Sequence, residues 1–594
     1  MSAEDGKHPV AHAGGLADAG TGVSQAAASH AAIEPRRRPW PLLPELLVMA
    51  ALGGLYSLPF VHTQAWALSF ACLGGLAWRA MTAGPGRAAL LGLAFGTVWL
   101  TAGTWWLFIS MHRYGGLAAP LAALAVALLS LALSGYLALA LALFARWRRG
   151  SAWHDAMLLA SLWLGAELAR GLIFTGFPWV ASGYSQVDAP LAALAPWLGV
   201  YGIGFVMTLL AAVLAAVLGS ALPWSGSWRR RAIDLALVLA ALLLAPMLLT
   251  REFTTSAGRL SVSLLQTNVA QDQKFALERM PEALARLEVA LQQARGSLVV
   301  APETAIPILP SQLGDQAWAR FTQRFTTGEH AALIGLPLGS YEEGYTNSVA
   351  GISAGTATQA AAGAAARTTA QTTAHTAARA ASQPAFAPAG IYRYDKHHLV
   401  PFGEFIPPGF RWFVELMNIP LGDFNRGVLV APSFEVVGPN RQVQRVAPNI
   451  CYEDLFGEEL ARRFVPESTA PTILANISNI GWFGNTIAVD QHLNISRLRT
   501  LELQRPMLRA TNTGATALVD HRGRVVAALA PFTFGTLEVE VEGRSGNTPF
   551  AAWAGRFGLW PYVVWVLLVV AACELSRRRA APSRLSAPRG PRTQ

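Results

Sequence analysis

The sequence has little charge and few cysteines. Only 14% of its 594 residues are charged and 53% are hydrophobic, whereas soluble domains carry about 25% charged residues. This composition excludes a wholly soluble protein, and we expect part of the chain to lie in lipid. The three cysteines form no CxxC pair, which excludes a disulfide framework and a cysteine-rich metal site.

Lysine is almost absent, because only Lys7, Lys274 and Lys396 are lysines among the 46 basic residues. The arginines that give the net charge of +10 lie in short clusters between apolar runs. This pattern is typical of membrane topology rather than of a nucleic-acid-binding surface. We therefore expect a membrane environment and no nucleic-acid partner.

About eight apolar runs are long enough to be transmembrane helices, which need roughly 20 residues each. Seven fall within residues 40–250 and the eighth within 556–578. The arginines concentrate in alternate loops, so the positive-inside rule predicts that both termini are cytoplasmic. Residues 1–39 are then a disordered cytoplasmic tail and 579–594 a second cytoplasmic tail. The segment 251–555 is predicted to lie on the outer side.

Within residues 251–555, short β-rich runs alternate with helical ones, which predicts an α/β domain. Residues 354–389 are low-complexity Ala, Thr and Gln, and we interpret them as a hairpin insertion without function. The predicted strands are 261–269, 297–304, 331–338, 345–353, 390–400, 445–453 and 472–479, with a further return to strand at 508–520. The predicted helices are 279–295, 315–327 and 488–504.

Three stretches place reactive residue types at the ends of β-rich runs, where active-site loops usually begin. They are APET with Glu303, YDKHHLVPFGEFIP with Lys396 and Glu404, and NICYEDLF with Cys451. A nucleophilic cysteine needs a base for its proton and a nearby cation. Glu303 could be that base. Lys396 could supply the positive charge and donate to an oxyanion.

Each of these residues also has an ordinary interpretation as a buried cysteine, a turn glutamate or a surface lysine. Two observations favour an active site: Lys396 persists in an arginine-rich chain, and Cys451 is the only cysteine in residues 251–555. The adjacent His397 and His398 would point to opposite faces of a strand, so we expect no metal site.

Two acids lie beside Cys451, and carboxylates disfavour a thiolate. If the strand continues past Cys451, Tyr452 and Asp454 point away from its face whereas Glu453 shares it. Glu453 must then be held by a partner or kept at a distance. In the fifth span, Glu167 and Arg170 precede the stretch GFPW. They are further functional candidates, although snorkelling at a helix end explains Arg170 more simply.

The three reactive stretches, in this order, resemble the nitrilase superfamily, which has a Glu-Lys-Cys triad and an αββα sandwich fold. With the membrane spans and the stretches FTGFPW, NISNIGWFGN and LELQRPMLRATNTG, the chain resembles the membrane-embedded branch of that superfamily, the apolipoprotein N-acyltransferase family. The resemblance runs from about residue 40 to 578 and leaves out the tails and the low-complexity insertion.

The resemblance implies that Glu303 is the general base, Lys396 the oxyanion and electrostatic residue, and Cys451 the nucleophile. Glu404 and Glu453 would support the site and Tyr452 would line it. The family moves an acyl chain from a phospholipid, typically phosphatidylethanolamine, to the cysteine. It then passes the chain to the amino group of diacylglyceryl-cysteine in an apolipoprotein.

The scheme implied by the resemblance is ping-pong and needs no cofactor or metal. The implied location is the bacterial inner membrane, with the catalytic domain in the periplasm, and we expect a monomer. A membrane-tethered nitrilase-like amidohydrolase is the rival enzyme, although eight spans favour a lipid substrate. A transporter or receptor with an outer binding domain is the non-catalytic rival, and a full triad would be superfluous there.

Three aromatic residues are candidates for lipid contact. Phe275 stands where family members often have tryptophan, and Trp482 and Phe483 belong to the stretch SNIGWFG. Exposed aromatics suit a bilayer interface, although core packing explains the last two about as well. Ile480 stands where an aspartate is common in the family, so no catalytic role is expected at that position.

Overall fold

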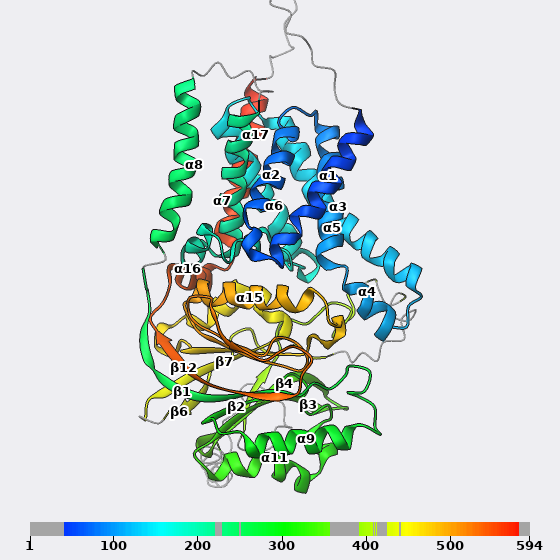
Figure 1. Ribbon diagram of the computed structural model, residues 1–594, viewed down its shortest axis with the longest axis vertical. Helices are drawn as coiled ribbons and strands as arrows, with labels where there is room; N and C mark the ends of the chain where they lie inside the picture. Colours follow the sequence, from blue (N-terminus) through cyan, green and yellow to red (C-terminus); the bar gives the residue numbers. More distant parts are fainter. Residues whose placement is uncertain are drawn as a thin grey trace, which may run out of the picture.

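The protein has a helical half and a half built of two β-sheets (Figure 1). The computed structural model describes residues 41–219, 228–248, 251–356, 391–407, 409, 412, 424–438 and 441–580. The predicted tail 1–39, the predicted tail 579–594 apart from its first two residues, and nearly all of the predicted insertion 354–389 lie outside these residues.

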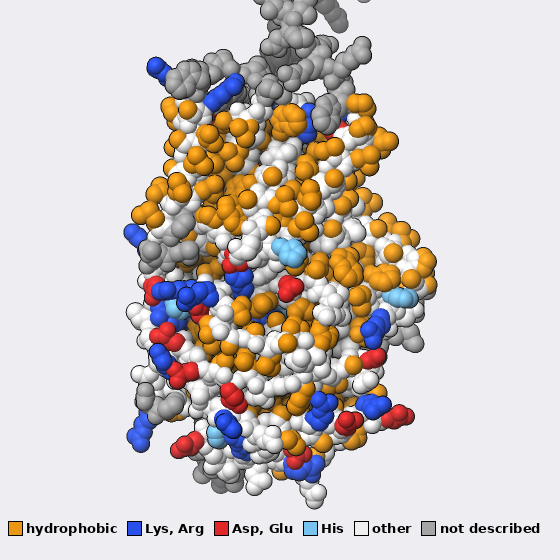
Figure 2. Space-filling model, in the orientation of Figure 1, with side chains coloured by type: hydrophobic (Ala, Val, Ile, Leu, Met, Phe, Trp, Pro, Cys, Tyr) orange, Lys and Arg blue, Asp and Glu red, His pale blue; other side chains and the backbone are white. Residues whose placement is uncertain are grey.

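The helical half consists mainly of apolar helices, most of them long. They are α1 (Leu42–Tyr56), α2 (Ala67–Ala80), α3 (Pro85–Thr104), the short α4 (Leu107–Ile109), α5 (Ala119–Trp147), α6 (Ala152–Leu172), α7 (Ala195–Leu218), α8 (Trp228–Leu248) and α17 (Trp560–Ala580). Their outward side chains are mostly hydrophobic, whereas charged side chains gather on the β half and at the far end of the helices (Figure 2). An apolar outer surface of this size suits contact with lipid.

The number of spans is lower in the described residues than the sequence predicts. Five helices there are long and apolar enough to cross a membrane. There are six if Pro85–Thr104 and Leu107–Tyr114, which are bent by 61° relative to each other, form one span. The helix α2 is apolar but shorter, and α8 does not meet the same criteria in its described part. The count of eight therefore stays a prediction.

Each sheet has six strands. The first has the order β12-β1-β2-β3-β4-β5 and the second β11-β10-β9-β8-β7-β6. In the first, β1, β2 and β3 are parallel, and in the second, β7, β8 and β9 are parallel. The strands are β1 (Thr255–Gln266), β2 (Leu298–Val300), β3 (Ala331–Ser340), β4 (Gly344–Ile352), β5 (Tyr392–Asp395), β6 (Phe434–Val437), β7 (Val443–Ile450), β8 (Ile473–Ser478), β9 (Met507–Thr511), β10 (Ala517–Val519), β11 (Val525–Ala528) and β12 (Gly535–Ser545).

The two sheets pack face to face between helical layers. Buried side chains of both sheets share one core, as with Leu264 and Val300 of the first and Ile477 of the second. On one side, α9 (Met280–Gln293) and α11 (Asp315–Thr327) cover the first sheet, and on the other α15 (Ala488–Leu503) separates the second sheet from the membrane helices (Figure 1). The β half is thus an αββα sandwich, as the resemblance predicts. The short α10 (Pro310–Leu313), α14 (Gly457–Ala461) and α16 (Pro549–Phe557) are further helices in the described part of this half.

Candidate active site

The three predicted triad residues follow three different strands. Glu303 comes after β2, Lys396 directly after β5, and Cys451 directly after β7. The carboxyl ends of these strands meet at one end of the sandwich, because Glu303 lies 3.5 Å from Lys396 and accepts from the backbone of Asn479, which follows β8, the parallel neighbour of β7. Active-site residues gather at such strand ends. The predicted strand 297–304 ends earlier than expected, at Val300, so Glu303 lies in a turn.

A buried cluster of two carboxylates and one ammonium forms the centre of the candidate site. Lys396 is 1% exposed, and its Nζ lies 2.8 Å from Oε1 of Glu404 and 3.5 Å from Oε1 of Glu303. Nδ2 of Asn347 donates to the same two oxygens at 2.7 Å each. The backbone N–H of Asn479 donates to Oε2 of Glu303 at 2.8 Å. Glu303 is thereby fixed in one orientation.

The charge of Lys396 is stable in this cluster. Burial by itself lowers the pKa of a lysine, but the carboxylates of Glu404 and then Glu303 outweigh it and raise the pKa of Lys396. Lys396 therefore stays protonated. A fixed ammonium beside the Cys451 sulfur can stabilise negative charge that develops there.

Cys451 sits at a sharp turn. The strand β7 ends at Ile450, and Cys451 opens a short 3₁₀ helix, Cys451–Leu455, with a left-handed φ of 51°. Residues other than glycine rarely adopt this backbone conformation, and such strain concentrates at active sites. The carbonyl oxygen of Cys451 accepts hydrogen bonds from Nδ2 of Asn476 and Nε2 of His492, both at 3.2 Å. These two donors hold the turn.

The predicted strand 445–453 is therefore wrong beyond Ile450. The alternation that should turn Tyr452 and Asp454 away from Cys451 does not apply, because a 3₁₀ helix places its side chains at intervals of three residues. The β-branched and apolar residues of 445–450 gave no sign of the left-handed turn that ends the strand.

The thiol of Cys451 is neutral in the resting protein. Burial raises its pKa, the carboxylate of Glu303 raises it further, and Lys396 lowers it only in part. A thiolate can therefore form only as its proton moves to a base. Glu303, whose charge opposes the thiolate, loses that charge when it takes the proton.

Glu453 is held in one orientation by four donors. Its Oε1 accepts from the backbone N–H groups of His397 at 2.7 Å and His398 at 3.2 Å. Its Oε2 accepts from the N–H of Ile450 at 2.6 Å and the hydroxyl of Tyr394 at 2.7 Å. Glu453 thus ties the segment after Lys396 to the turn at Cys451, which is the supporting contact that the sequence required.

Tyr452 is buried and reaches the helical half. Its hydroxyl donates to the carbonyl oxygen of Gly176 at 3.0 Å. Nε2 of His398 lies 2.9 Å from the carbonyl oxygen of Thr175. The loop 173–180, which contains GFPW, is therefore in direct contact with the segments that carry Lys396 and Cys451.

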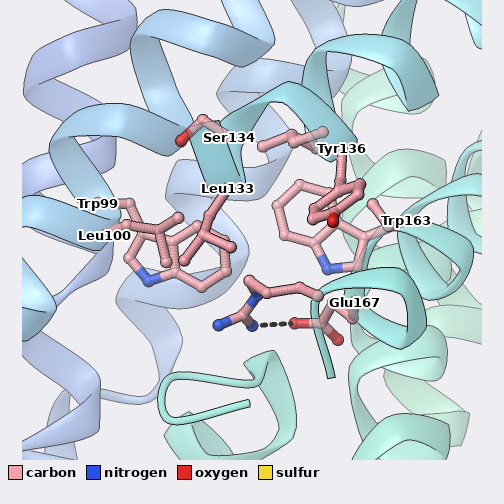
Figure 3. Close-up of a pocket in the computed structure, with 11 residues that line it drawn as sticks. Trp99, Leu100, Leu133, Ser134, Tyr136, Trp163 and Glu167 are labelled. Carbon is pink, nitrogen blue, oxygen red and sulfur yellow. Dashed lines mark ion pairs between the residues drawn. The ribbon is translucent and has the colours of Figure 1, made fainter. Parts of the chain in front are cut away.

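Glu167 and Arg170 hold that same loop from inside the helical half. Arg170 donates to the carbonyl oxygens of Phe177 at 3.2 Å and Val180 at 3.3 Å, and its guanidinium pairs with Glu167 at 3.7 Å. The pair lines a small cavity together with Trp99 (Figure 3). Both residues are buried, so Arg170 does not reach water by snorkelling.

Sequence reasoning missed a second buried cluster behind Cys451. Nε2 of His492 lies 3.1 Å from Oδ1 of Asp454, and Arg509 lies 3.3 Å from Oδ2. A guanidinium only donates, so Nδ1 of His492, 3.0 Å from Arg509, accepts, and Nε2 carries the proton. Burial raises the pKa of Asp454, but His492 and Arg509 outweigh it and hold the pKa below its usual value.

Asn347, Asn479 and Lys274 were also missed. Only Lys274 carried a signal, which was the rarity of lysine in the chain. Asparagines that position a carboxylate have no signature in a single sequence. Among the described residues, no group of three or more His, Cys, Asp or Glu side chains is arranged to hold a metal ion.

The three candidate lipid-contact residues lie in different surroundings. Phe275 is 46% exposed. Trp482 and Phe483 are half-buried: Trp482 packs edge-on against Tyr114 at 5.7 Å, and Phe483 lies 4.2 Å from the ring of Trp106. These contacts are with the segment after α3, at the boundary between the two halves, and Phe483 also lies edge-on to Trp179 at 6.2 Å.

Comparison with known proteins covers both halves. The Apolipoprotein N-acyltransferase N-terminal domain matches residues 52–213, and the Carbon-nitrogen hydrolase domain matches residues 261–549. The apolipoprotein N-acyltransferase of Verminephrobacter eiseniae is 45% identical over 552 residues, which are 88% of this chain and 93% of the relative. The chain belongs to the apolipoprotein N-acyltransferase family.

Further members of the family match along most of their length. The apolipoprotein N-acyltransferase of Ralstonia nicotianae is 43% identical over 89% of this chain and 93% of the relative. The apolipoprotein N-acyltransferase of Bordetella bronchiseptica is 40% identical over 90% of this chain and 97% of the relative. The relatives' names describe N-acyl transfer to apolipoproteins, and the chain is thus an acyltransferase of lipoprotein biosynthesis whose β half is a nitrilase-like domain.

Proposed function

We propose that this acyltransferase moves a fatty acyl chain from a membrane phospholipid, through a thioester on Cys451, to the amino terminus of an apolipoprotein. The observation that carries the proposal is the arrangement of Glu303, Lys396 and Cys451. A base with fixed orientation and a permanent ammonium act on one half-buried thiol at a strained turn. Phosphatidylethanolamine is the expected donor.

In the first half-reaction, the Sγ of Cys451 attacks the ester carbonyl of the phospholipid while its proton passes to Glu303. The ammonium of Lys396 stabilises the oxyanion that forms. The C–O bond then breaks, and the lysophospholipid leaves as an alcohol with the proton from Glu303. The acyl group remains on Cys451 as a thioester.

In the second half-reaction, the amino group of the diacylglyceryl-cysteine acceptor attacks the thioester carbonyl. Its proton passes to Glu303 and then to Sγ as the C–S bond breaks, which restores Cys451 and leaves an amide. Glu303 thus serves as base in both halves, in a ping-pong sequence. Water must be kept out, or the thioester would hydrolyse.

The setting that we propose is the bacterial inner membrane. Residues 40–250 and 556–578 would form the membrane part, and residues 251–555 the catalytic domain in the periplasm. The arginines at the helix ends far from the sheets support cytoplasmic termini, because they lie on the side that the positive-inside rule assigns to the cytoplasm. We propose that the protein acts as a monomer and without a cofactor.

The proposal is tested by giving the purified protein phosphatidylethanolamine with a labelled acyl chain, together with a diacylated lipopeptide. We expect labelled triacylated lipopeptide as the product. Release of labelled fatty acid, with no labelled lipopeptide, would instead indicate the membrane-tethered amidohydrolase. Cys451→Ala serves as the control and should give neither product.

A further inference from the structure

Lys274 is a second buried lysine at the candidate site that the mechanism above does not use. It lies in the loop between β1 and α9, is 5% exposed, and donates from Nζ to the carbonyl oxygen of Glu303 at 2.8 Å. The next residue, Phe275, is half-exposed. The loop therefore turns Lys274 inward, toward the residue proposed as the base.

The loop that carries Lys274 is held by the segments that also hold Glu303. Asn512 donates from Nδ2 to the carbonyl oxygen of Val269 at 2.8 Å, and its Oδ1 accepts from the Val269 N–H at 2.9 Å. Nδ2 of Asn479 donates to Oε1 of Gln271 at 2.8 Å. Because the N–H of Asn479 also donates to Glu303, Lys274 and the Glu303 carboxylate share one rigid frame.

Lys396 is not the only cation that faces the reacting residues of the site. Lys396 pairs most closely with Glu404, and that pair is neutral. In the proposed reaction a proton moves from Cys451 to Glu303 and leaves with the lysophospholipid, and the acceptor amine later supplies another. Glu303, Cys451 and the bound intermediate together carry one negative charge throughout. Arg509 also faces Cys451, but Asp454 neutralises it. The charge of Lys274 acts on both Glu303 and Cys451.

We propose that Lys274 is the counter-ion of the Glu303–Cys451 pair, an inference that rests on the proposed function. Its ammonium lies where one negative charge moves between the carboxylate, the sulfur and the oxyanion, and it stabilises that charge wherever it resides. Lys274 acts through Glu303 and Cys451, so it is a positioning and electrostatic residue.

The burial of Lys274 makes its charge, and therefore this role, dependent on pH. Burial lowers the pKa of Lys274 to about 8, against the opposing charges of Glu303 and Cys451. The ammonium is therefore present below about pH 8 and lost above it. Lys396, which lies between Glu404 and Glu303, keeps its charge over the same range because its pKa is raised.

Three substitutions at residue 274 separate the effect of its charge from the effect of its hydrogen bond to the Glu303 carbonyl oxygen. Lys274→Arg keeps the charge, Lys274→Gln keeps a donor for the Glu303 carbonyl without charge, and Lys274→Met keeps only the apolar stem. Gln273→Ala, at an exposed position of the same loop, is the matched control. Thermal unfolding shows which variants fold, and the Arg and Gln variants decide the question even if the Met variant does not fold.

The readout is the rate at which iodoacetamide alkylates Cys451 in the full-length protein as a function of pH. Mass spectrometry measures the Cys451 peptide, with the Cys573 peptide of α17 as an internal reference. This assay needs no lipid. It therefore tests Lys274 separately from the acyl transfer, whose own failure would appear as the absence of an acyl group on Cys451.

We expect Lys274→Gln and Lys274→Met to move the alkylation profile of Cys451 to higher pH. Alkylation needs the thiolate. A tenfold fall in the acid dissociation constant of the Cys451 thiol should therefore slow the reaction about tenfold at fixed pH. Lys274→Arg should keep the profile near that of the wild type at neutral pH and extend it above pH 8. A Lys274→Gln variant with the wild-type profile would overturn the proposal, because Lys274 would then act only through its hydrogen bond to the Glu303 carbonyl oxygen.

Discussion

At the scale of single residues, each acid near Cys451 has a separate task set by its partners. Glu453 binds the segment after Lys396 with one oxygen, and Ile450 and Tyr394 with the other. Glu404 neutralises Lys396, and Glu303 is left to exchange a proton. The sequence predicted that Glu453 needs a partner. It could not name Tyr394, because only the fold brings β5 beside the turn after β7.

Lys396→Arg should lower acyl-enzyme formation by at least about 100-fold, the loss typical when an oxyanion donor is removed. A guanidinium keeps the charge but is too large and planar for the space between Glu303 and Glu404. The measurement is the single-turnover rate of Cys451 acylation.

The matched control for this exchange is Arg393→Lys, two residues upstream of Asp395 on β5, where Arg393 pairs with that carboxylate. It should leave the rate close to that of the wild type. A near-normal rate in Lys396→Arg would show that the ammonium is not needed at this position.

Asp454→Asn should destabilise the protein at neutral pH by about 3–5 kcal/mol, because it leaves Arg509 buried without its carboxylate. The folded pKa of Asp454 is lowered, so its stabilising charge is present above its usual pKa, about 4, and is lost as pH falls through the lowered value. The difference in thermal midpoint between wild type and variant should therefore shrink below about pH 4. An equal difference from pH 7 to pH 3 would contradict this.

At the scale of elements, strongly periodic segments were predictable and chain reversals were not. The predicted helices 279–295, 315–327 and 488–504 match α9, α11 and α15 within a few residues. The missed β12, GTLEVEVEGRS, alternates apolar and charged residues and could have been found from that pattern. The turn at Cys451 carries no glycine or asparagine, so its left-handed conformation is imposed by tertiary contacts.

Gly176→Ala should disrupt the loop 173–180 and with it the contact to Tyr452. Gly176 has a φ of 82°, and an added Cβ would overlap the carbonyl oxygen of Gly171. Gly116 also has a positive φ, 67°, but has open space around it. Gly116→Ala should therefore cost only the backbone strain of about 1–3 kcal/mol.

The comparison is made on the rate of Cys451 acylation and on the thermal midpoint. We expect the acylation rate and the thermal midpoint to fall further in the Gly176 variant than in the Gly116 variant. Equal losses would mean that the loop does not position the site.

At the scale of the whole molecule, the helical half and the sandwich meet through hydrogen bonds as well as apolar contact. Gln491 of α15 accepts from the indole N–H groups of Trp106 at 3.0 Å and Trp179 at 2.8 Å, and donates to the carbonyl oxygen of Gly103 at 3.0 Å. The sequence predicted two halves from their composition. It could not predict this interface, because its partners are up to 434 positions apart, as with Asn494 and Phe60.

Replacing residues 354–389 with a short turn should leave acylation largely intact. β4 and β5 are antiparallel neighbours, and Gly351 pairs with Tyr392, so a short loop can join the same two strands. The acylation rate and the thermal midpoint are the measurements. Loss of both folding and activity would contradict the interpretation of this segment as an insertion without function.

The central claim is that Cys451 carries the acyl group. The measurement that tests it most directly is mass spectrometry of the Cys451 peptide after the purified protein is incubated with phosphatidylethanolamine alone. The account predicts one acyl mass on that peptide, removed by a diacylated lipopeptide and absent in Cys451→Ala. An acyl group found on another residue, or a Cys451→Ala variant still charged by labelled phospholipid, would contradict it.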